Sequence, residues 1–346
     1  MGAVSREGGK LPVLVTGGAG YVGSHACLAL IDAGWPVVVL DNLTTGFRWA
    51  VPQEAAFIEG DVGDGVVVER LLRDHGIGAI MHFAGSVIVP ESMADPLKYY
   101  RNNTASSLAL LDAAVAARVP HFIFSSTAAI YGIPERMPVD ETAPTRPISP
   151  YGRSKLMIEQ MIADVAAAHP INYCVLRYFN VAGADPAGRI GQSTLGATHL
   201  IKVAVEAAVG KRSHVAVFGT DYPTPDGTGL RDFIHVSDLA DAHVRALEAL
   251  IAEPERSHVL NCGYGRGFTV FEVLDSVERV AGVRIERRLE PRRTGDLAAM
   301  VADNAAIVAR LGWHPRHAEL DAMVAHAIKW ERGLDDLLAR HGTAGR

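Results

Sequence analysis

Residues 16–23 read TGGAGYVG. This segment follows the apolar run LPVLV at 11–15 and precedes SHACLALIDAG, a segment of helical periodicity, at 24–34. A glycine-rich loop between a strand and a helix is typical of dinucleotide-binding α/β domains. A glycine string by itself also fits a plain turn, but the flanking strand and helix argue against that alternative. We therefore predict that this segment decides the fold and holds a dinucleotide.

Three glycines of this loop have separate predicted roles. Gly17 permits the tight turn, Gly20 lets the backbone approach a pyrophosphate, and Gly23 allows close packing of the helix on the strand. The helix N-terminus adds unpaired N–H groups and the positive end of the helix dipole. Both features favour a diphosphate group at this loop.

Outward from the loop, residues 11–180 alternate short apolar runs with segments of helical periodicity. This alternation predicts a parallel sheet with helices on both faces. Residues 1–180 are therefore predicted to form a doubly wound α/β domain of the Rossmann type that binds NAD. Its further strand-like runs are PVVVLD at 36–41, FIEGDV at 57–62, AIMHFAG at 79–85, HFIFSST at 121–127 and INYCVLRYFN at 171–180.

The composition changes after residue 180. Two stretches, 181–196 and 219–229, are rich in Gly, Pro, Asp and Thr, which predicts long loops that carry the substrate. Helical and strand-like segments around them predict a smaller α/β substrate-binding domain over 181–346, which includes VLNCGYG at 259–265. The stretch 231–250 is predicted to rejoin the first domain, and its strand-like run RDFIHV is predicted to rejoin the first sheet.

Composition and charge exclude several classes of protein. The 346-residue chain is 49% hydrophobic with a net charge of −6, which disfavours a nucleic-acid partner. No window of about 18 residues is free of charge and the N-terminal segment is polar, so we expect no membrane span, no signal peptide and a cytoplasmic location. Cys27, Cys174 and Cys262 lie far apart in apolar runs, which predicts core residues and neither a disulfide nor a metal site.

Tyr151 and Lys155, in SPYGRSK at 149–155, are four residues apart, so a helix places both side chains on one face. A positive charge about 6 Å from a phenol contributes roughly 3 kcal/mol at an effective dielectric of about 20, or about two pKa units. We therefore expect the pKa of Tyr151 to fall toward neutrality. The pair alone also fits a solvated helix face, and the glycine loop favours a proton-transfer base beside a nicotinamide cofactor.

Asp41 ends the second predicted strand, about 20 residues past the glycine loop, where a carboxylate accepts hydrogen bonds from the adenosine ribose. A 2′-phosphate would meet Asp41 as a like charge, and the next residues, Asn42 and Leu43, supply no arginine to offset it. The predicted cofactor is therefore NAD and not NADP. The alternative is that Asp41 is a simple turn residue.

Ser125, Ser126 and Thr127 lie at the carboxyl end of the run HFIFSST, where open α/β sheets bind ligands. Thr127 is the predicted partner of a substrate hydroxyl, and Ser125 or Ser126 could share this role. Backbone capping is the alternative for hydroxyl groups at the end of a strand.

The spacing GxxGxxG together with Thr127, Tyr151 and Lys155 resembles the extended short-chain dehydrogenase/reductase superfamily. The resemblance implies that Tyr151 is the general acid and base, that Thr127 aligns the substrate hydroxyl, and that Lys155 holds the nicotinamide ribose. It also implies cofactor contacts at Gly17, Gly20, Tyr21, Val22, Gly23, Asp41, Asn42, Asp61, Val62, Phe83, Ala84, Gly85, Asn102, Ser125, Tyr151, Lys155 and Tyr178.

Further motifs match in order across nearly the whole chain, including LRYFNVAGA at 176–184 and PRRTGDL at 291–297. Together they resemble the UDP-glucose 4-epimerase family. The resemblance implies interconversion of UDP-glucose and UDP-galactose by transient oxidation at C4, with tightly bound NAD, in a homodimer built on two long helices. It implies substrate contacts at Thr127, Tyr151, Phe179, Asn180, His199, Leu200, Phe218, Arg231, Arg293 and Asp296.

Arginines suit this substrate because a diphosphate accepts hydrogen bonds from a guanidinium fork. Without the resemblance, Arg231 beside Asp232 also fits a local ion pair, and PRRTGD also fits a turn. His199 also fits an ordinary residue at the start of a helix.

The chain departs from the family at several positions. Val87 stands where many members carry a lysine near the cofactor phosphates, so one charge contact is absent or replaced. Thr198, His199 and Leu200 replace an Asn-Asn-Leu stretch. Met300 lies where the family controls room for the 2-substituent of the sugar, and its flexible side chain leaves N-acetylated sugars open.

Three other functions compete with this prediction. A 4,6-dehydratase of nucleotide sugars needs an Asp-Glu pair directly after the strand-end threonine, where this chain has Ala128 and Ala129. A scaffold of the same fold without activity would not need Thr127, Tyr151 and Lys155 together. A 4-epimerase of another UDP-sugar, such as an N-acetylhexosamine, a pentose or a uronic acid, stays open.

Overall fold

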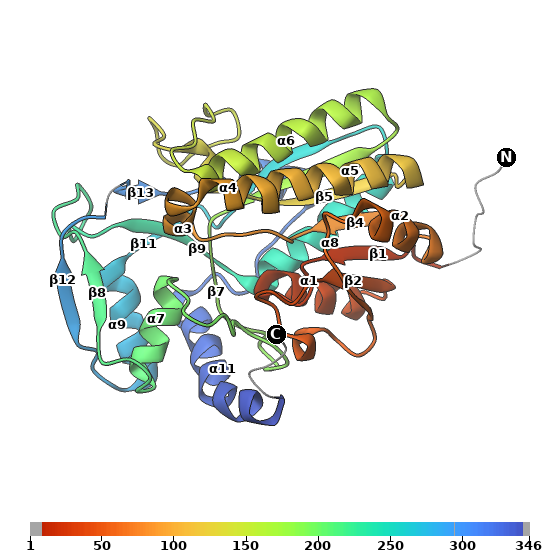
Figure 1. The fold of residues 1–346 in the computed structure, drawn as a ribbon. Helices are drawn as coiled ribbons and strands as arrows, with labels where there is room; N and C mark the ends of the chain where they lie inside the picture. The colour runs from red at the N-terminus through yellow and green to blue at the C-terminus, as the bar shows by residue number, and fades with distance from the viewer. Residues whose placement is uncertain (1–8, 294, 342–346) are drawn as a thin grey trace.

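The computed structural model describes residues 9–293 and 295–341 of the chain. Its largest sheet has seven strands, all parallel, in the order β10-β6-β5-β4-β1-β2-β3. Figure 1 shows this sheet with helices above and below it. The predicted α/β class with a doubly wound parallel sheet is confirmed. Its strands are β1 (Val13–Thr16), β2 (Val37–Asp41), β3 (Ala56–Glu59), β4 (Ala79–His82), β5 (His121–Thr127), β6 (Asn172–Tyr178) and β10 (His258–Cys262).

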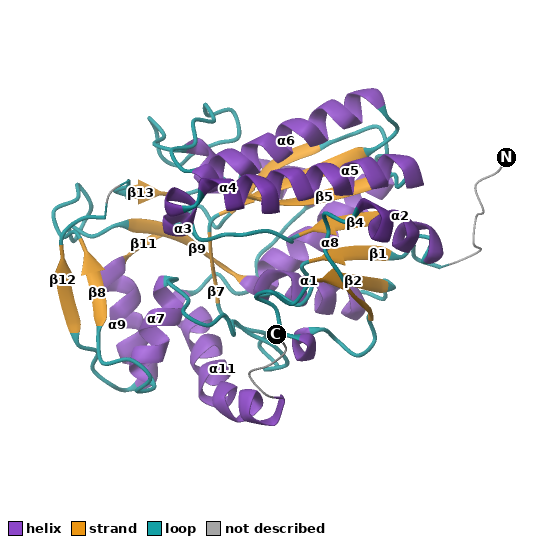
Figure 2. Cartoon of the chain, in the orientation of Figure 1, coloured by secondary structure: helices purple, strands orange, loops and turns teal. Residues whose placement is uncertain are grey.

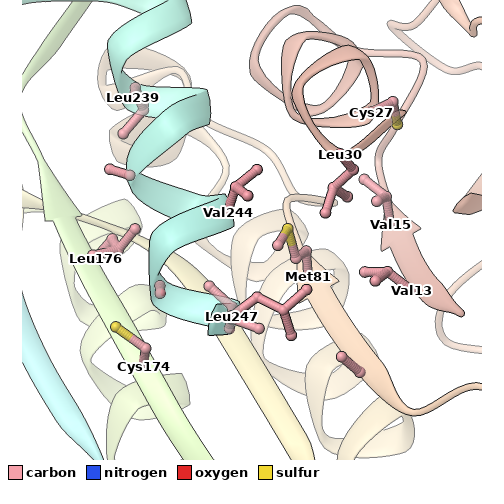
Figure 3. Close-up of a cluster of buried hydrophobic side chains, with 14 of the residues drawn as sticks. Val13, Val15, Cys27, Leu30, Met81, Cys174, Leu176, Leu239, Val244 and Leu247 are labelled. Carbon is pink, nitrogen blue, oxygen red and sulfur yellow. The ribbon is translucent and has the colours of Figure 1, made fainter. Parts of the chain in front are cut away.

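Two hydrophobic layers hold the helices on this sheet because neighbouring residues of each strand point to opposite faces. Val13 and Val15 of β1 pack with α1, α8 and α10, whereas Leu14 packs on the other side with α2, α5 and α6. Figure 3 shows the first layer, to which α1 contributes Leu30 and α8 contributes Leu239, Val244 and Leu247. The helices are α1 (Tyr21–Asp32), α2 (Gly65–Asp74), α5 (Ser106–Ala117), α6 (Pro150–Ala168), α8 (Val236–Ala252) and α10 (Ala305–Leu311).

The remaining elements form a smaller α/β unit beside the large sheet, at the left of Figure 2. Four short strands make its central sheet, in which β9 pairs with β7, β11 and β13, and a separate parallel pair joins β8 to β12. The strands are β7 (Asn180–Ala182), β8 (Val215–Phe218), β9 (Leu230–His235), β11 (Gly267–Thr269), β12 (Arg287–Glu290) and β13 (Ala299–Met300). Its helices are α7 (Leu200–Ala208), α9 (Val270–Ala281) and α11 (Leu320–His341).

The prediction that RDFIHV rejoins the first sheet is wrong. These residues form β9, whose partners all belong to the smaller sheet. Helix α8, which follows, does pack on the large domain against α1, and the next strand, β10, completes the large sheet beside β6. The run VLNCGYG therefore belongs to the first sheet and not to the smaller domain. An apolar run reveals a strand, but its partner depends on contacts far away in the chain.

Short helices connect β4 to α5. They are α3 (Val89–Ala94), α4 (Pro96–Tyr99) and a π-helical turn, η2 (Tyr100–Ala105); two 3₁₀ turns, η1 (Arg48–Ala50) and η3 (Ala128–Tyr131), follow β2 and β5. Across residues 9–293 and 295–341, no helix combines the length and apolar character that crossing a membrane requires. The predicted domains reach from residue 1 to residue 346, so their outermost residues, 1–8 and 342–346, lie outside the described part.

Candidate active site

The glycine loop connects β1 to α1, and two of its glycines have no room for a side chain. Gly17 has φ +72°, and a Cβ there would lie 2.7 Å from Ala84 N. A Cβ on Gly23 would lie 2.2 Å from Gly17 O, so the close approach of helix to loop requires glycine. Gly20 caps α1 without a side-chain hydrogen bond, and the first turn carries no acidic residue. The first turn of α1 thus offers its N–H groups to an anion.

Asp41, at the end of β2, fastens this loop. Its Oδ2 accepts a hydrogen bond from Ala19 N at 2.9 Å and its Oδ1 accepts one from Leu43 N at 2.8 Å. Burial raises the pKa of Asp41, and the two backbone N–H groups counteract this rise. Beside it, Asn42 Nδ2 donates to Asp61 Oδ2 at 3.1 Å, so these two predicted cofactor contacts are neighbours.

The segment after β4 supplies the next predicted contacts. Phe83 packs against His243 of α8 with ring centroids 4.7 Å apart, and Ala84 lies against Gly17. The π-helical turn holds the following loop, because Asn102 Nδ2 donates to Ser86 Oγ at 2.9 Å and Asn103 Oδ1 accepts from Ser86 N at 2.7 Å. Single π-helical turns often occur at functional sites.

Thr127 and Ser125 present hydroxyls at the carboxyl end of β5. Thr127 Oγ1 accepts a hydrogen bond from Ala129 N at 3.1 Å, which leaves its own proton free to donate. Ser125 Oγ is buried and has no hydrogen-bond partner within the described ranges. Capping therefore accounts for one lone pair of Thr127, and both hydroxyls can still contact a ligand.

Lys155 lies one helical turn after Tyr151 on α6, but its side chain points to β5. Its Nζ donates to Ser125 O at 3.0 Å and lies 4.8 Å from the ring centroid of Phe124. Burial lowers the pKa of Lys155 to about 8, and the carboxylate of Glu159 counteracts this effect. Lys155 is 2% exposed, so its charge is enclosed close to the strand end.

Tyr151 lies near Thr127 in an enclosed position, 6% exposed. Burial raises the pKa of Tyr151, Tyr178 raises it further, and a hydrogen bond with Thr127 lowers it. This direction is opposite to the fall toward neutrality predicted from Lys155. The reason is desolvation, which disfavours the phenolate, while the ammonium group is directed to Ser125 O.

The predicted substrate residues of the smaller domain form two adjacent contacts. Arg231, on β9, donates from its guanidinium to the carboxylate of Asp296. Arg293 lies over the ring of Phe218, at the end of β8, with its Cζ 3.7 Å from the ring centroid. A guanidinium beside a planar aromatic ring can hold a diphosphate and stack on a base.

A hydrophobic cluster connects these residues to the Tyr151 side. Phe179 and Met300 pack with Ala128 and Tyr131 of η3, which directly follows Thr127, and partly buried Leu297 packs against them. Leu297 is the next residue after Asp296. The segment 296–300 therefore runs from the Arg231 contact to the 3₁₀ turn beside Thr127.

Three predicted substrate residues lie at the edges of this arrangement. Asn180 is exposed on β7, and Leu200 begins α7. His199 Nδ1 is hydrogen-bonded to Gln192 Nε2 at 2.9 Å, so reaching a diphosphate would require its other ring nitrogen.

The structure adds residues that the sequence interpretation missed. Tyr99 is fully buried and packs edge-on against Tyr151, with centroids 6.3 Å apart, and its hydroxyl donates to Ile88 O at 2.6 Å. Arg292 lies over Tyr222, with its Cζ 4.2 Å from the ring centroid. The double tyrosine at 99–100 and the paired arginines were visible signals, but spacing alone did not assign these contacts.

Comparison with known proteins agrees with this site. Residues 13–263 match the model of the NAD dependent epimerase/dehydratase family. The chain belongs to this family.

Relatives within the family are similar over almost their whole length. UDP-glucose 4-epimerase of Azospirillum brasilense is 54% identical over 96% of this chain and 95% of its own. UDP-glucose 4-epimerase of Lactobacillus helveticus is 44% identical over 93% and 97%. The crystal structure of UDP-glucose 4-epimerase from Brucella ovis in complex with NAD matches with a TM-score of 0.89 at 43% identity, covering 92% and 98%. The predicted resemblance to the UDP-glucose 4-epimerases is confirmed.

The residues present fit a dinucleotide. Gly17 and Gly23 let the loop, α1 and the end of β4 approach one another closely, the first turn of α1 has no side-chain cap, and Ser125 Oγ is a buried hydroxyl without a partner among the described residues. These features together can accept a diphosphate at the loop and a polar group at the end of β5.

Proposed function

We propose that this chain interconverts UDP-glucose and UDP-galactose by inverting the configuration at C4, with NAD as its cofactor. The observation that carries the proposal is that the predicted catalytic residues and the predicted nucleotide-binding residues are connected by packing. The Thr127–Tyr151 pair, with Lys155 beside it, is linked to the Arg231–Asp296 pair through the cluster of Phe179 and Met300. Relatives at 42–54% identity named UDP-glucose 4-epimerase support the same activity.

The first domain would hold NAD. The glycine loop and the first turn of α1 would bind its diphosphate, Asp41 would bind the adenosine ribose, and Lys155 would bind the nicotinamide ribose, with further contacts from Asn42, Asp61, Phe83, Asn102 and Tyr178. When bound, NAD would supply the hydride acceptor and donor for C4 of the sugar.

Tyr151 moves the proton of the C4 hydroxyl. It accepts this proton when C4 is oxidised to the ketone and returns it to the same oxygen when C4 is reduced, so no proton is gained or lost over the cycle. Thr127 can donate its hydroxyl proton to the reacting oxygen while its own oxygen accepts from Ala129 N. The ammonium group of Lys155 adds positive charge beside the strand end.

The nucleotide end holds the substrate while the sugar turns. Arg231 and Arg293 bind the diphosphate, and Phe218 packs beside the uracil. With these groups fixed, the 4-keto sugar turns about its diphosphate linkage and presents its opposite face for reduction. Inversion requires this turn because hydride leaves one face of C4 and returns to the other.

Two alternatives are less well supported. Ala128 and Ala129 follow Thr127 in η3, and their methyl groups cannot exchange the protons that a dehydratase must move. Another UDP-sugar could be the substrate, because Met300, 6% exposed, packs beside Phe179 at the expected sugar end. The names of the relatives favour glucose and galactose.

The test is to incubate purified protein with UDP-galactose, with and without added NAD, and to measure UDP-glucose. Tyr151→Phe is the matched control, and UDP-N-acetylgalactosamine and UDP-xylose are parallel substrates. We expect the wild type to convert UDP-galactose without added NAD, and Tyr151→Phe to show little conversion. No conversion with NAD supplied, alongside turnover of a parallel substrate, would reject the assignment to glucose and galactose.

We also propose that the chain forms a homodimer through α5 and α6. Leu108 of α5 is 55% exposed and Met157 of α6 is 41% exposed, so each helix carries a large apolar side chain in contact with solvent. Light scattering with the wild type and Leu108→Glu/Met157→Glu tests this assembly, and a monomeric wild type would reject it.

A cytoplasmic location stays a prediction, which cell fractionation would test.

A further inference from the structure

The loop 42–51, between β2 and β3, rests directly on the glycine loop. Phe47 N donates to Ala19 O at 3.1 Å, and a Cβ on Gly46 would lie 2.8 Å from Ala19 C. Ala19 is also the residue whose backbone N–H donates a hydrogen bond to the carboxylate of Asp41. A shift of this loop would therefore move the backbone between Gly17 and Gly20, where the diphosphate is expected.

An aromatic stack joins this loop to the C-terminal helix of the smaller domain. Phe47 stacks on Trp49 with centroids 5.1 Å apart, and Trp49 packs on Trp330 of α11 with centroids 6.2 Å apart. Trp330 is 9% exposed and lies so close to Gly191 that a Cβ there would be 2.4 Å from its Cγ. The stack therefore connects residues that are 281 positions apart in the chain (49 and 330).

The two indoles act by packing and not by hydrogen bonding. Neither Trp49 Nε1 nor Trp330 Nε1 has a hydrogen-bond partner within the described residues. Trp330 is held from the other side, because its neighbour Glu331 pairs with buried Lys202 of α7 and with Lys211 at 2.8 Å. Helix α11 is thus held against α7 by this ion pair, and its Trp330 packs against Trp49.

The same elements surround one recess beside the glycine loop. Its lining comes from the glycine loop and α1 (Ala19, Gly20, Tyr21), the loop 42–51 (Thr45, Phe47, Ala50) and the smaller domain (Gly191, Ser193, Thr194). Phe47 of the aromatic stack lines this recess, as does Gly191, which lies against Trp330.

We propose that Trp49 and Trp330 are positioning residues that hold the loop 42–51 against the glycine loop and thereby slow the release of NAD. The inference rests on the proposed function only in taking NAD as the cofactor. Release requires the loop to lift from Ala19, and lifting it separates Phe47 and Trp49 from Trp330. Aromatic pairs of this kind stabilise a contact beyond their buried area, and loss of one pair corresponds to a roughly 2- to 13-fold change in rate.

The experiment measures NAD release directly. Protein loaded with radiolabelled NAD is chased with unlabelled NAD, and the label that stays on the protein is followed by rapid gel filtration. We expect Trp49→Leu and Trp330→Leu each to release NAD several-fold to about tenfold faster, and the double variant to add little, because both remove one stack. Trp49→Phe, which keeps an aromatic ring on Trp330, should stay close to the wild type.

Trp35→Leu is the matched control, since Trp35 is also a buried tryptophan of the first domain with an unpartnered Nε1 among the described residues, but it lies outside the stack. It should release NAD within about twofold of the wild-type rate. Wild-type release from Trp49→Leu, or equal acceleration by Trp35→Leu, would overturn the inference. If Trp330→Leu fails to fold, Trp49→Leu and Trp49→Phe decide. A wild type that binds no NAD at all would reject the proposed function and this inference with it.

Discussion

The phenol of Tyr151 is enclosed by residues from several elements, and this enclosure determines how its proton can be moved. Tyr99 packs against its ring from α4, and Thr127 at the end of β5 lowers its pKa against the effect of burial. Since burial raises the pKa of Tyr151, the free protein keeps this phenol protonated near neutral pH. A basic Tyr151 therefore requires positive charge closer to the phenol than Lys155 supplies, because Lys155 Nζ is directed to Ser125 O.

Removing the hydroxyl of Tyr151 tests its role in proton transfer. We expect Tyr151→Phe to lower kcat for UDP-galactose at least about a hundredfold, because a general acid and base contributes roughly 10²–10⁴-fold. NAD content and UDP binding should stay close to wild-type levels, since Tyr151 is one of many predicted contacts and the phenyl ring is kept. Steady-state kinetics and calorimetric UDP titration measure the two effects, and a variant that keeps its turnover would remove Tyr151 from this role.

Lys155 lowers the stability of the protein in its present environment. Its pKa in the fold is about 8, below the ordinary value of 10.5, so between these pH values the unfolded chain binds a proton that the folded chain does not. The free energy of unfolding of the wild type therefore rises with pH across this window. Below pH 8 the buried charge of Lys155 destabilises the fold to its full extent.

We accordingly expect Lys155→Met to raise the melting temperature of the cofactor-free protein at pH 7, with a gain that shrinks as the pH approaches 10.5, while activity is lost. Differential scanning fluorimetry at a series of pH values measures this effect. Lys98→Met, at a side chain on the surface, is the control. An equal gain at pH 7 and pH 10.5 would contradict a cause in the buried charge.

At the scale of elements, a buried ion pair fastens α6 to the sheet. Glu159 of α6 accepts hydrogen bonds from Arg177 of β6, at 2.7 Å from Nη2 to Oε2, and from Ser126 of β5. Both charged side chains are less than 10% exposed, at 8% and 6%. The pair holds the helix that carries Tyr151 and Lys155 against the strands that carry Thr127 and Tyr178. The sequence interpretation assigned no role to either residue, because their pairing depends on the packing of α6 on the sheet.

Breaking this pair on one side should be costly. We expect Arg177→Leu to lower the free energy of unfolding by about 3–5 kcal/mol, because it leaves Glu159 buried without its counter-charge. Glu159→Leu/Arg177→Leu should recover part of the loss, since no charge then stays buried alone. Urea denaturation of both variants and of Glu159→Leu gives the free energies of unfolding for a double-mutant cycle. A loss below about 1 kcal/mol for Arg177→Leu would show that Glu159 finds another partner.

The position of a strand can be predicted from the local sequence, but its partner strands cannot. The glycine loop leads from β1 into α1 as predicted, because turn chemistry and periodicity act over a few residues. The strand RDFIHV was also recognised, but it was assigned to the wrong sheet. Its partners, β7, β11 and β13, come from positions between 180 and 300, and nothing within the strand distinguishes them from β6.

At the scale of the whole molecule, buried histidines make the fold sensitive to acid. Burial lowers the pKa of four of them in the fold: His25 to about 4, His82 to about 3, His235 to about 2 and His243 to about 4. They lie on α1, β4, β9 and α8, so they are distributed over both domains. As the pH falls below 6.5, the unfolded chain binds protons that the folded chain does not, and stability falls with it.

His82 offers a single test of this behaviour. Its ring accepts or donates hydrogen bonds at 2.7 Å to Thr16 and at 2.7 Å to Ser107, both of which an amide can replace in part. We expect His82→Gln to reduce the loss of stability between pH 6.5 and pH 4 by about 1.4 kcal/mol per pH unit. Denaturant titrations over this pH range measure the slope. His75→Gln, at the surface, should leave the slope unchanged, and an unchanged slope in His82→Gln would contradict the assignment.

The sequence by itself determined the α/β class, the order of most elements, the cofactor loop and the spacing of Tyr151 and Lys155. These features depend on periodicity and turn chemistry within short segments, where each residue constrains its neighbours. The tertiary structure alone decided the sheet of β9 and β10, the direction in which the pKa of Tyr151 moves, and the contacts Arg231–Asp296 and Trp49–Trp330. Each of these depends on burial or on a partner far away in the chain, and desolvation and packing exist only once the distant segments have met.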